Sequence, residues 1–166
     1  MNIIKNVHTI SILVSNKPGV LVRVALVFAK RGYNIDSLVV SPAFNPDYSR
    51  MTITAQGDPE TLEQIIKQVG KLIDVIHAEE HSDKEAVHQE LVLFKLNYTK
   101  STKPIISKLV KQFSAQILDD SENSMIIQYT NTSTKADEFE MLLKKYNVVE
   151  MVRSGKLAIT CGKEKT

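Results

Sequence analysis

The segment from Ser15 to Leu21 holds the residues best suited to bind a small ligand. It joins an alternating apolar run to a helical pattern, so the unpaired N–H groups of a helix N-terminus would face the loop and favour a carboxylate. Gly19 has no Cβ and lets a ligand approach the backbone closely. Asn16 offers a carbonyl oxygen for an ammonium group as well as amide donors. A carboxylate and an ammonium group together describe an α-amino acid.

Three apolar residues and a second amide extend this hypothesis. Val20, Leu21 and Ile35 are candidates to line a pocket for the side chain of the amino acid. Asn34 directly precedes a predicted strand and is a polar group that a partner subunit would bring to the same place. The alternative is that the segment is only a helix cap and a tight turn without a ligand. The residues alone leave both interpretations open.

The rest of the sequence offers no catalytic constellation. It has no phosphate-binding loop, no dinucleotide-binding glycine motif, no nucleophile elbow and no paired cysteine and histidine. His77 and His81 are four residues apart, but they fall on a strand end and a linker, which favours a solvated linker over a metal site. Cys161 is the single cysteine, which excludes an intrachain disulfide and a cysteine zinc cage. We therefore expect no catalytic residues, no metal and no cofactor on this chain.

Charge and hydropathy exclude two further classes of partner. The formal net charge is +2, from 21 basic and 19 acidic residues, which does not require a polyanion. No apolar run approaches the ~18 residues of a membrane span. The N-terminus, residues 1–5, lacks the features of a signal or transit peptide. We expect a soluble protein in a reducing compartment that binds neither nucleic acid nor membrane.

The hydrophobic periodicity predicts the order β-α-β-β-α-β twice, which is an α+β fold of two ferredoxin-like sandwiches. Asp58 is the expected N-cap of the second helix, and Gly155 is expected to form a hairpin turn between two strands. The predicted strands cover residues 8–14, 35–40, 51–55, 75–79, 91–96, 116–118, 125–129, 148–149 and 157–159, and helical stripes cover 21–28, 62–73, 106–113 and 139–146.

The RNA-recognition module shares this element order, but it stacks bases on aromatic residues of its two central strands. Here those strands carry Ile10, Ile12, Met51 and Ile53, which argues against base stacking. The polar stretch 81–85 marks the predicted boundary between a first domain, residues 6–81, and a second, residues 85–163. Each sheet would have one face without helices and two open edges, so we expect an oligomer.

Several motifs carry a resemblance to a known family. They are Asn-Lys-Pro-Gly-Val-Leu at 16–21, Arg-Gly-Tyr-Asn-Ile-Asp-Ser-Leu at 31–38, Ser-Arg-Met-Thr-Ile at 49–53, and shorter matches at 62–65, 71–75, 90–95 and 153–155. With these motifs the chain resembles the small, regulatory subunits of acetolactate synthase, whose N-terminal part is an ACT domain. The resemblance spans nearly the whole chain and is strongest over residues 8–80.

The resemblance implies a regulatory subunit without an active site of its own. It would pair through its ACT domains as a homodimer, bind a larger catalytic subunit, raise its activity and make it sensitive to feedback inhibition by valine, with leucine or isoleucine as alternatives. Thiamine diphosphate, Mg²⁺ and FAD would belong to the catalytic subunit. The implied location is the cytoplasm, or the plastid stroma for a plastid-encoded chain.

The resemblance also implies which residues bind the effector, at the interface between two ACT domains. These are Asn16, Lys17, Pro18, Gly19, Val20 and Leu21 from one chain, and Asn34 with Ile35 from the other. Pro18 departs from the family, in which a small polar residue is frequent there. Because proline at the first helical position lacks an N–H, carboxylate binding would rely on the amides from Gly19 onward.

Two other classes of function are compatible with parts of the sequence. A free-standing amino-acid sensor that controls another enzyme or a transcription factor would use the same ligand loop. An independent enzyme, such as a small phosphatase of similar fold, would need a phosphate loop with paired arginine and asparagine, and residues 15–21 contain no arginine. Co-purification with a larger thiamine enzyme distinguishes the first class from the regulatory subunit.

Overall fold

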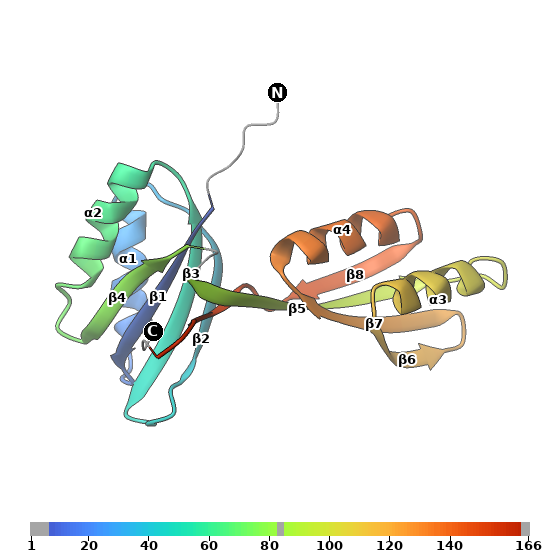
Figure 1. Ribbon diagram of the computed structural model, residues 1–166, viewed down its shortest axis with the longest axis horizontal. Coiled ribbons are helices and arrows are strands. Elements are labelled where there is room, and N and C mark those ends of the chain that lie inside the picture. The colour runs from blue at the N-terminus through green and yellow to red at the C-terminus, as the bar shows by residue number, and fades with distance from the viewer. Residues whose placement is uncertain (1–6, 83–84, 164–166) are drawn as a thin grey trace. The chain divides into compact units, whose positions relative to one another are not determined.

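The computed structural model describes residues 7–82 and 85–163, which form two compact units (Figure 1). The first unit runs to Val87 and also includes the chain from Gly155 onward, and the second is His88–Ser154. The N-terminal residues discussed above, together with Asp83 and Lys84 of the predicted linker, lie outside the described residues. The predicted α+β class with two β-α-β-β-α-β units is confirmed.

The first unit is a four-stranded antiparallel sheet with two helices on one face (Figure 1). The strand order is β2-β3-β1-β4. The elements are β1 (Val7–Ser15), α1 (Val20–Ala29), β2 (Ile35–Pro42), β3 (Tyr48–Gln56), α2 (Pro59–Val69) and β4 (Val75–His81). The core lies between sheet and helices, and alternate residues of the two central strands, Ile10, Ile12, Met51 and Ile53, are buried in it.

Local sequence signals set the helix ends of this unit. Gly19 starts α1 with φ 83°, a left-handed conformation that glycine adopts without steric cost. After α1, Gly32 has φ 71° and the Tyr33 N–H donates to the Phe28 carbonyl, which together close the helix in the manner of a Schellman motif. Asp58 caps α2, as predicted, because its Oδ2 accepts from the Thr61 N–H at 2.9 Å.

The second unit repeats the layout with the strand order β6-β7-β5-β8. Its elements are β5 (Ala86–Asn97), α3 (Lys103–Gln112), β6 (Gln116–Ser121), β7 (Ser124–Asn131), α4 (Ser133–Leu143) and β8 (Val148–Arg153). Aromatic rings fill the core: Phe139 lies edge to face with Phe94 at a centroid distance of 5.6 Å and is tilted against Tyr129 at 4.9 Å. Such pairs stabilise a core beyond the area that they bury.

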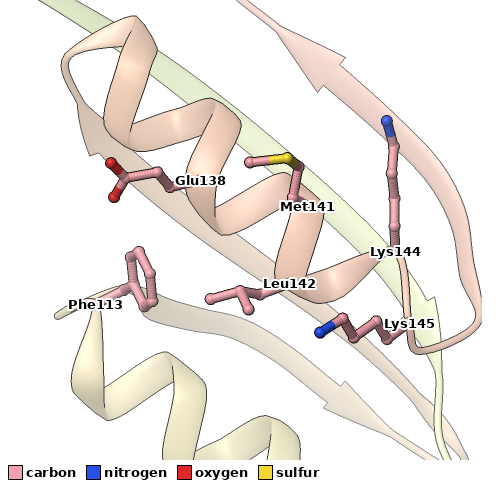
Figure 2. Close-up of a pocket in the computed structure, with 6 residues that line it drawn as sticks. All are labelled: Phe113, Glu138, Met141, Leu142, Lys144 and Lys145. Carbon is pink, nitrogen blue, oxygen red and sulfur yellow. The ribbon is translucent and has the colours of Figure 1, made fainter.

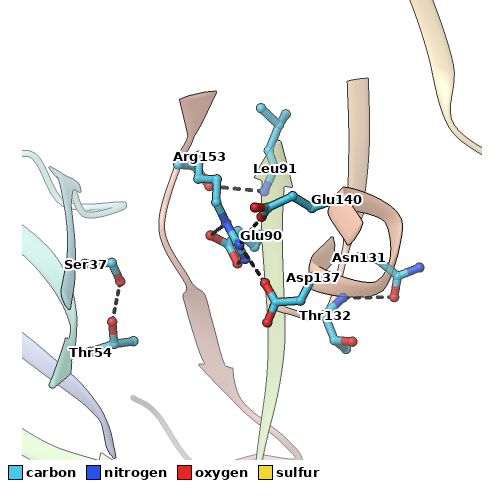
Figure 3. Close-up of polar contacts among 10 residues, drawn as sticks. Ser37, Thr54, Glu90, Leu91, Asn131, Thr132, Asp137, Glu140 and Arg153 are labelled. Carbon is cyan, nitrogen blue, oxygen red and sulfur yellow. Dashed lines mark hydrogen bonds and ion pairs between the residues drawn. The ribbon is translucent and has the colours of Figure 1, made fainter. Parts of the chain in front are cut away.

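An ion-pair cluster holds the end of β8 in this unit (Figure 3). The Arg153 guanidinium binds both oxygens of Glu90, at 2.9 and 2.7 Å, and reaches Asp137 at 2.6 Å and Glu140 at 3.2 Å. The hydrogen bonds to Glu90 raise the pKa of Arg153 above its ordinary value, so the guanidinium stays charged. The cluster ties β5, α4 and β8 together.

The prediction of a hairpin at Gly155 is wrong. β8 and the last strand, β9 (Leu157–Thr160), do not pair with each other; both pair with β5. The Ser154 N–H donates to the Leu91 carbonyl and the Cys161 N–H to the Glu85 carbonyl, so the chain continues along β5 past Gly155. By its contacts β9 therefore belongs to the first unit, whereas the sequence analysis had assigned it to the second domain.

The first sheet was expected to have one face without helices, and that face is nevertheless partly covered by the C-terminal segment. Thr9, Ser11, Thr52 and Thr54 lie on the face opposite the helices, yet each is at most 5% exposed. The Lys156 Nζ donates to the Thr9 hydroxyl at 3.2 Å. Gly155 packs so closely on β2 that an added Cβ would lie 3.0 Å from the Cβ of Ser37. The segment that begins at Gly155 thus covers part of this polar face.

Candidate effector site

The loop between β1 and α1 is fastened to the turn between β2 and β3. The Asn16 N–H donates to the Asp47 carbonyl at 2.8 Å, and the Asn16 Nδ2 donates to the Pro46 carbonyl at 3.0 Å. The side-chain amide group is therefore used within the chain, in contrast to its predicted availability for a ligand. The Asn16 Oδ1 atom makes no hydrogen bond within the described residues and is the acceptor left for an ammonium group.

The N-terminus of α1 is open to an anion. No side chain caps it, and its first turn holds no acidic residue. This contrasts with α2, where Asp58 caps the helix and Glu60 lies in the first turn. A helix start without these groups keeps its N–H donors and partial positive charge for another partner, and the binding of a carboxylate there stays a prediction.

Arg23 lies in the first turn of α1 beside this loop and is not among the residues predicted from the sequence. An added Cβ on Gly19 would lie 3.2 Å from the Arg23 Nη1, which shows how closely the guanidinium approaches the helix start. Arg23 also binds the Asp74 carboxylate at 2.5 Å, and its side chain is 45% exposed. The signal in the sequence was its position four residues after Gly19, which places both on one side of the first helical turn.

The apolar candidates divide between core and surface. Val20 is 3% exposed and belongs to the core cluster of the first unit, so it does not line an open pocket as predicted. Leu21 is 39% exposed and points away from the core, while Lys17 and Pro18 are exposed in the loop. Of the predicted pocket wall on this loop, only Leu21 is accessible.

Asn34 and Ile35 lie at the opposite end of the unit from the loop. Ile35 pairs with Ala55, whereas Ser15 pairs with Tyr48. Ala55 and Tyr48 are seven residues apart along β3, about 23 Å at 3.3 Å per residue. One amino acid cannot span this distance, so within a single chain the two predicted halves of the site are not brought together.

The outer side of α1 is unusually apolar for an exposed helix. Leu21, Val22 and Leu26 are between 39% and 60% exposed, and Arg23 is the only charged residue of the helix. A helix that is apolar all round is normally buried against another element. β2, the strand that follows α1, is an edge of the sheet. These two neighbouring features are suited to contact with another chain.

Comparison with known proteins agrees with the resemblance seen in the motifs. Residues 10–77 match the model of the AHAS small subunit-like ACT domain, and residues 89–162 match that of the small subunit of acetolactate synthase. The chain belongs to the acetolactate synthase small-subunit family. Its first unit contains the ACT domain that the resemblance implied.

Relatives of the acetolactate synthase small-subunit family match over nearly the full chain. The chain is 42% identical over 158 residues to a probable acetolactate synthase small subunit from Archaeoglobus fulgidus, covering 95% of this chain and 99% of the relative. It is 41% identical to the chloroplastic small subunit 2 of Arabidopsis thaliana over 92% of this chain and 31% of that longer protein. The crystal structure of the Thermotoga maritima small subunit superposes with a TM-score of 0.86 at 35% identity, covering 96% of this chain and 99% of that one.

Two further observations concern metals and membranes. Within residues 7–82 and 85–163, no group of three or more histidine, cysteine, aspartate or glutamate side chains is placed to hold a metal ion. In the same part of the chain, no helix has both the length and the apolar character needed to span a lipid bilayer.

Proposed function

We propose that this chain activates the catalytic subunit of acetolactate synthase and makes it sensitive to feedback inhibition by valine. The proposal rests on membership of the small-subunit family together with one geometric observation: the uncapped helix start and Asn34 lie at opposite ends of α1. A site assembled from both must therefore lie between two chains. Thiamine diphosphate, Mg²⁺ and FAD would be bound by the catalytic subunit, and the complex would be located in the cytoplasm or the plastid stroma.

A two-fold dimer built on α1 and β2 would assemble this site. If the apolar sides of α1 from two chains pack antiparallel, the start of one helix lies beside the end of the other. The Gly19 loop of one protomer then faces Asn34 and Ile35 of its partner. The valine carboxylate would bind the amides after Gly19 near Arg23, its ammonium group would bind amide oxygens of Asn16 and Asn34, and Leu21 and Ile35 would contact its side chain.

Regulation then follows from the position of the ligand between two chains. Valine would stabilise the dimer arrangement in which both halves of the site fit it, and a ligand shifts an equilibrium only by its differential affinity for the two states. Couplings of about 1–3 kcal/mol correspond to changes of about 5- to 150-fold. The same coupling requires that binding of the catalytic subunit alters the affinity for valine.

The first experiment measures acetolactate synthesis by the catalytic subunit with and without this chain, across valine, leucine and isoleucine. We expect activation by the chain and inhibition by valine. If no thiamine enzyme co-purifies with the chain and no branched-chain amino acid binds it in calorimetric titration, the proposal is refuted. Valine binding without a thiamine-enzyme partner would instead support the free-standing sensor.

Two variants test the site and the dimer separately. Asn34→Ala should reduce inhibition by valine and leave activation largely intact, because Asn34 is exposed and its proposed contact is with the effector. Leu26→Glu, in the middle of the apolar side of α1, should produce a monomer in sedimentation equilibrium and abolish valine binding. Ile73→Glu is the matched control, since Ile73 is 94% exposed and lies outside α1. A monomeric Leu26→Glu variant that binds valine normally would contradict the shared site.

A further inference from the structure

The two helices of the second unit leave a groove between them. α1 and α2 pack against each other, whereas α3 and α4 make at most marginal contact (Figure 1). The groove has a volume of about 590 Å³ (Figure 2). Its lining residues are Phe113, Glu138, Met141, Leu142, Lys144 and Lys145.

Two smaller hollows extend this groove at its ends. A hollow of about 400 Å³ shares Phe113 and Glu138 with it, and another of about 200 Å³ shares Lys145. Both hollows therefore adjoin the groove, and together the three extend from Asn131 and Lys135 to the turn at residues 98–102. An elongated surface of this kind is suited to a peptide segment more than to a compact metabolite.

The centre of the groove is apolar and held in place from beneath. The Phe113 ring packs on Phe139 at a centroid distance of 4.8 Å and lies edge to face with Tyr129 at 5.9 Å, which fixes its position. Leu142 faces the same space from α4, and Met141 beside it is 62% exposed (Figure 2). An exposed methionine next to fixed rings adapts to apolar side chains of different shapes.

The charge around the groove is positive once internal ion pairs are considered. Lys144 binds Glu140 at 2.6 Å, and Lys135 binds Glu138 at 2.8 Å, so these charges cancel. Lys145, which lines the groove, makes no ion pair within the described part of the chain. A bound segment that supplies a carboxylate would pair with this cation.

We propose that the α3–α4 groove binds an acidic amphipathic segment of the catalytic subunit. This rests on the proposed function, which requires that subunit as partner. One apolar side chain of the segment contacts Phe113 and Leu142 beside Met141, and a flanking carboxylate binds Lys145. A second copy of this chain is a poorer match, because its most apolar exposed helix, α1, carries Arg23 and no acidic residue.

The test compares groove variants with variants on the opposite face of the same sheet. Lys145→Glu and Met141→Glu each alter the groove, while Lys95→Glu and Val152→Glu are matched controls. Lys95 alternates with the buried Phe94 and Leu96, and Val152 pairs with Leu93 on that other face. We expect each groove variant to weaken binding to the purified catalytic subunit at least tenfold in biolayer interferometry, and each control to stay within twofold.

Three outcomes decide the proposal against its alternatives. Groove variants that bind like the wild type overturn it, and so do variants that alter only self-association in sedimentation equilibrium. If Met141→Glu fails to fold, the variant Lys145→Gln, at an exposed position, still tests the proposal. It must lower both the affinity for the catalytic subunit and the salt dependence of that affinity. If the wild-type chain itself does not bind the catalytic subunit, the proposed function fails, and that result is distinct from a failure of the groove.

The contact can also be mapped directly. A photo-crosslinker attached to Met141→Cys in a Cys161→Ser background should capture the catalytic subunit, in a segment that mass spectrometry identifies as acidic and amphipathic. Capture of a basic segment, or of a second copy of this chain, would overturn the proposal.

Discussion

Gly155→Ala should detach the C-terminal segment from the first unit. Gly155 has φ 84°, and an added Cβ would lie 3.0 Å from the Ser37 Cβ and 3.2 Å from the Val39 Cγ2. Both neighbours are side-chain atoms close to the backbone of β2, so they cannot move aside without a shift of the strand. The substitution therefore combines an unfavourable backbone conformation with a close contact.

The magnitude of this effect has two parts. An L-residue in the left-handed region costs about 1–2 kcal/mol. Overpacking against β2 adds about 1–3 kcal/mol. A substitution at Gly162 distinguishes the backbone cost from the packing cost, because the φ of Gly162 is 79° and an added Cβ there would meet nothing within 4 Å. Gly162→Ala therefore measures conformational strain alone, and Gly155→Ala should exceed it by at least about 1 kcal/mol.

Hydrogen exchange is the appropriate assay, because it reports the local opening of a strand as well as global unfolding. The Cys161 N–H, which donates to the Glu85 carbonyl at 2.8 Å, should exchange about tenfold faster for each 1.4 kcal/mol of local destabilisation. Ser37→Gly in the Gly155→Ala background removes the crowded Cβ and should recover part of the protection. Equal effects of Gly155→Ala and Gly162→Ala, or the absence of any recovery, would refute the role assigned to the contact.

Three further predictions concern single charged groups. Arg23→Ala should weaken valine binding in calorimetry while lowering stability by less than about 1 kcal/mol, because its ion pair is half-exposed; unchanged affinity would remove Arg23 from the site. Arg153→Met removes the guanidinium that binds both oxygens of the Glu90 carboxylate, which is 7% exposed. The loss of these charge-assisted hydrogen bonds should lower the free energy of unfolding by about 1.5–3 kcal/mol in denaturant titration, and Glu90→Gln should restore part of it. The hydrogen bond from the Thr61 N–H holds the pKa of Asp58 below its usual value of 3.8. The Asp58 carboxylate therefore stabilises the fold above about pH 3.8, and this stabilisation is lost as the pH falls through the lowered pKa. Asp58→Ala should remove that part of the acid unfolding transition.

The element order was predictable because it depends on local patterns. The helical stripes after Gly19 and Asp58, and the alternation in β1 and β3, are short-range signals, and each is found where the sequence placed it. The path of β9 depends instead on a partner strand about seventy residues earlier, which no local pattern specifies. In the sequence, Gly155 lies between two apolar runs, a pattern that is typical of a hairpin turn. Only the pairing of both runs with β5 shows that the two runs do not form a hairpin with each other.

The position of the candidate loop at a helix start was predictable from the sequence, whereas the contacts of its residues were not. Gly19 does start an uncapped helix, as the loop composition indicated. The sequence did not show that Val20 faces the core, because neighbouring positions of α1 are apolar on all sides. Asn16 and Arg23 have their main partners at Pro46 and Asp74, far away in the chain, and such contacts form only when the sheet is assembled.

The separation of the site along α1 explains why sensing and assembly are linked in the proposed function. α1 has ten residues, a length of about 15 Å at 1.5 Å per residue, and the candidate ligand groups lie before its start and after its end. Because one chain offers only half of the contacts, the affinity for valine depends on the fraction of chains that are paired, and valine in turn favours pairing by the same free energy. In the proposed dimer, the apolar α1 surface, which would be a liability in a monomer, would be the element through which a small metabolite controls the arrangement of two subunits.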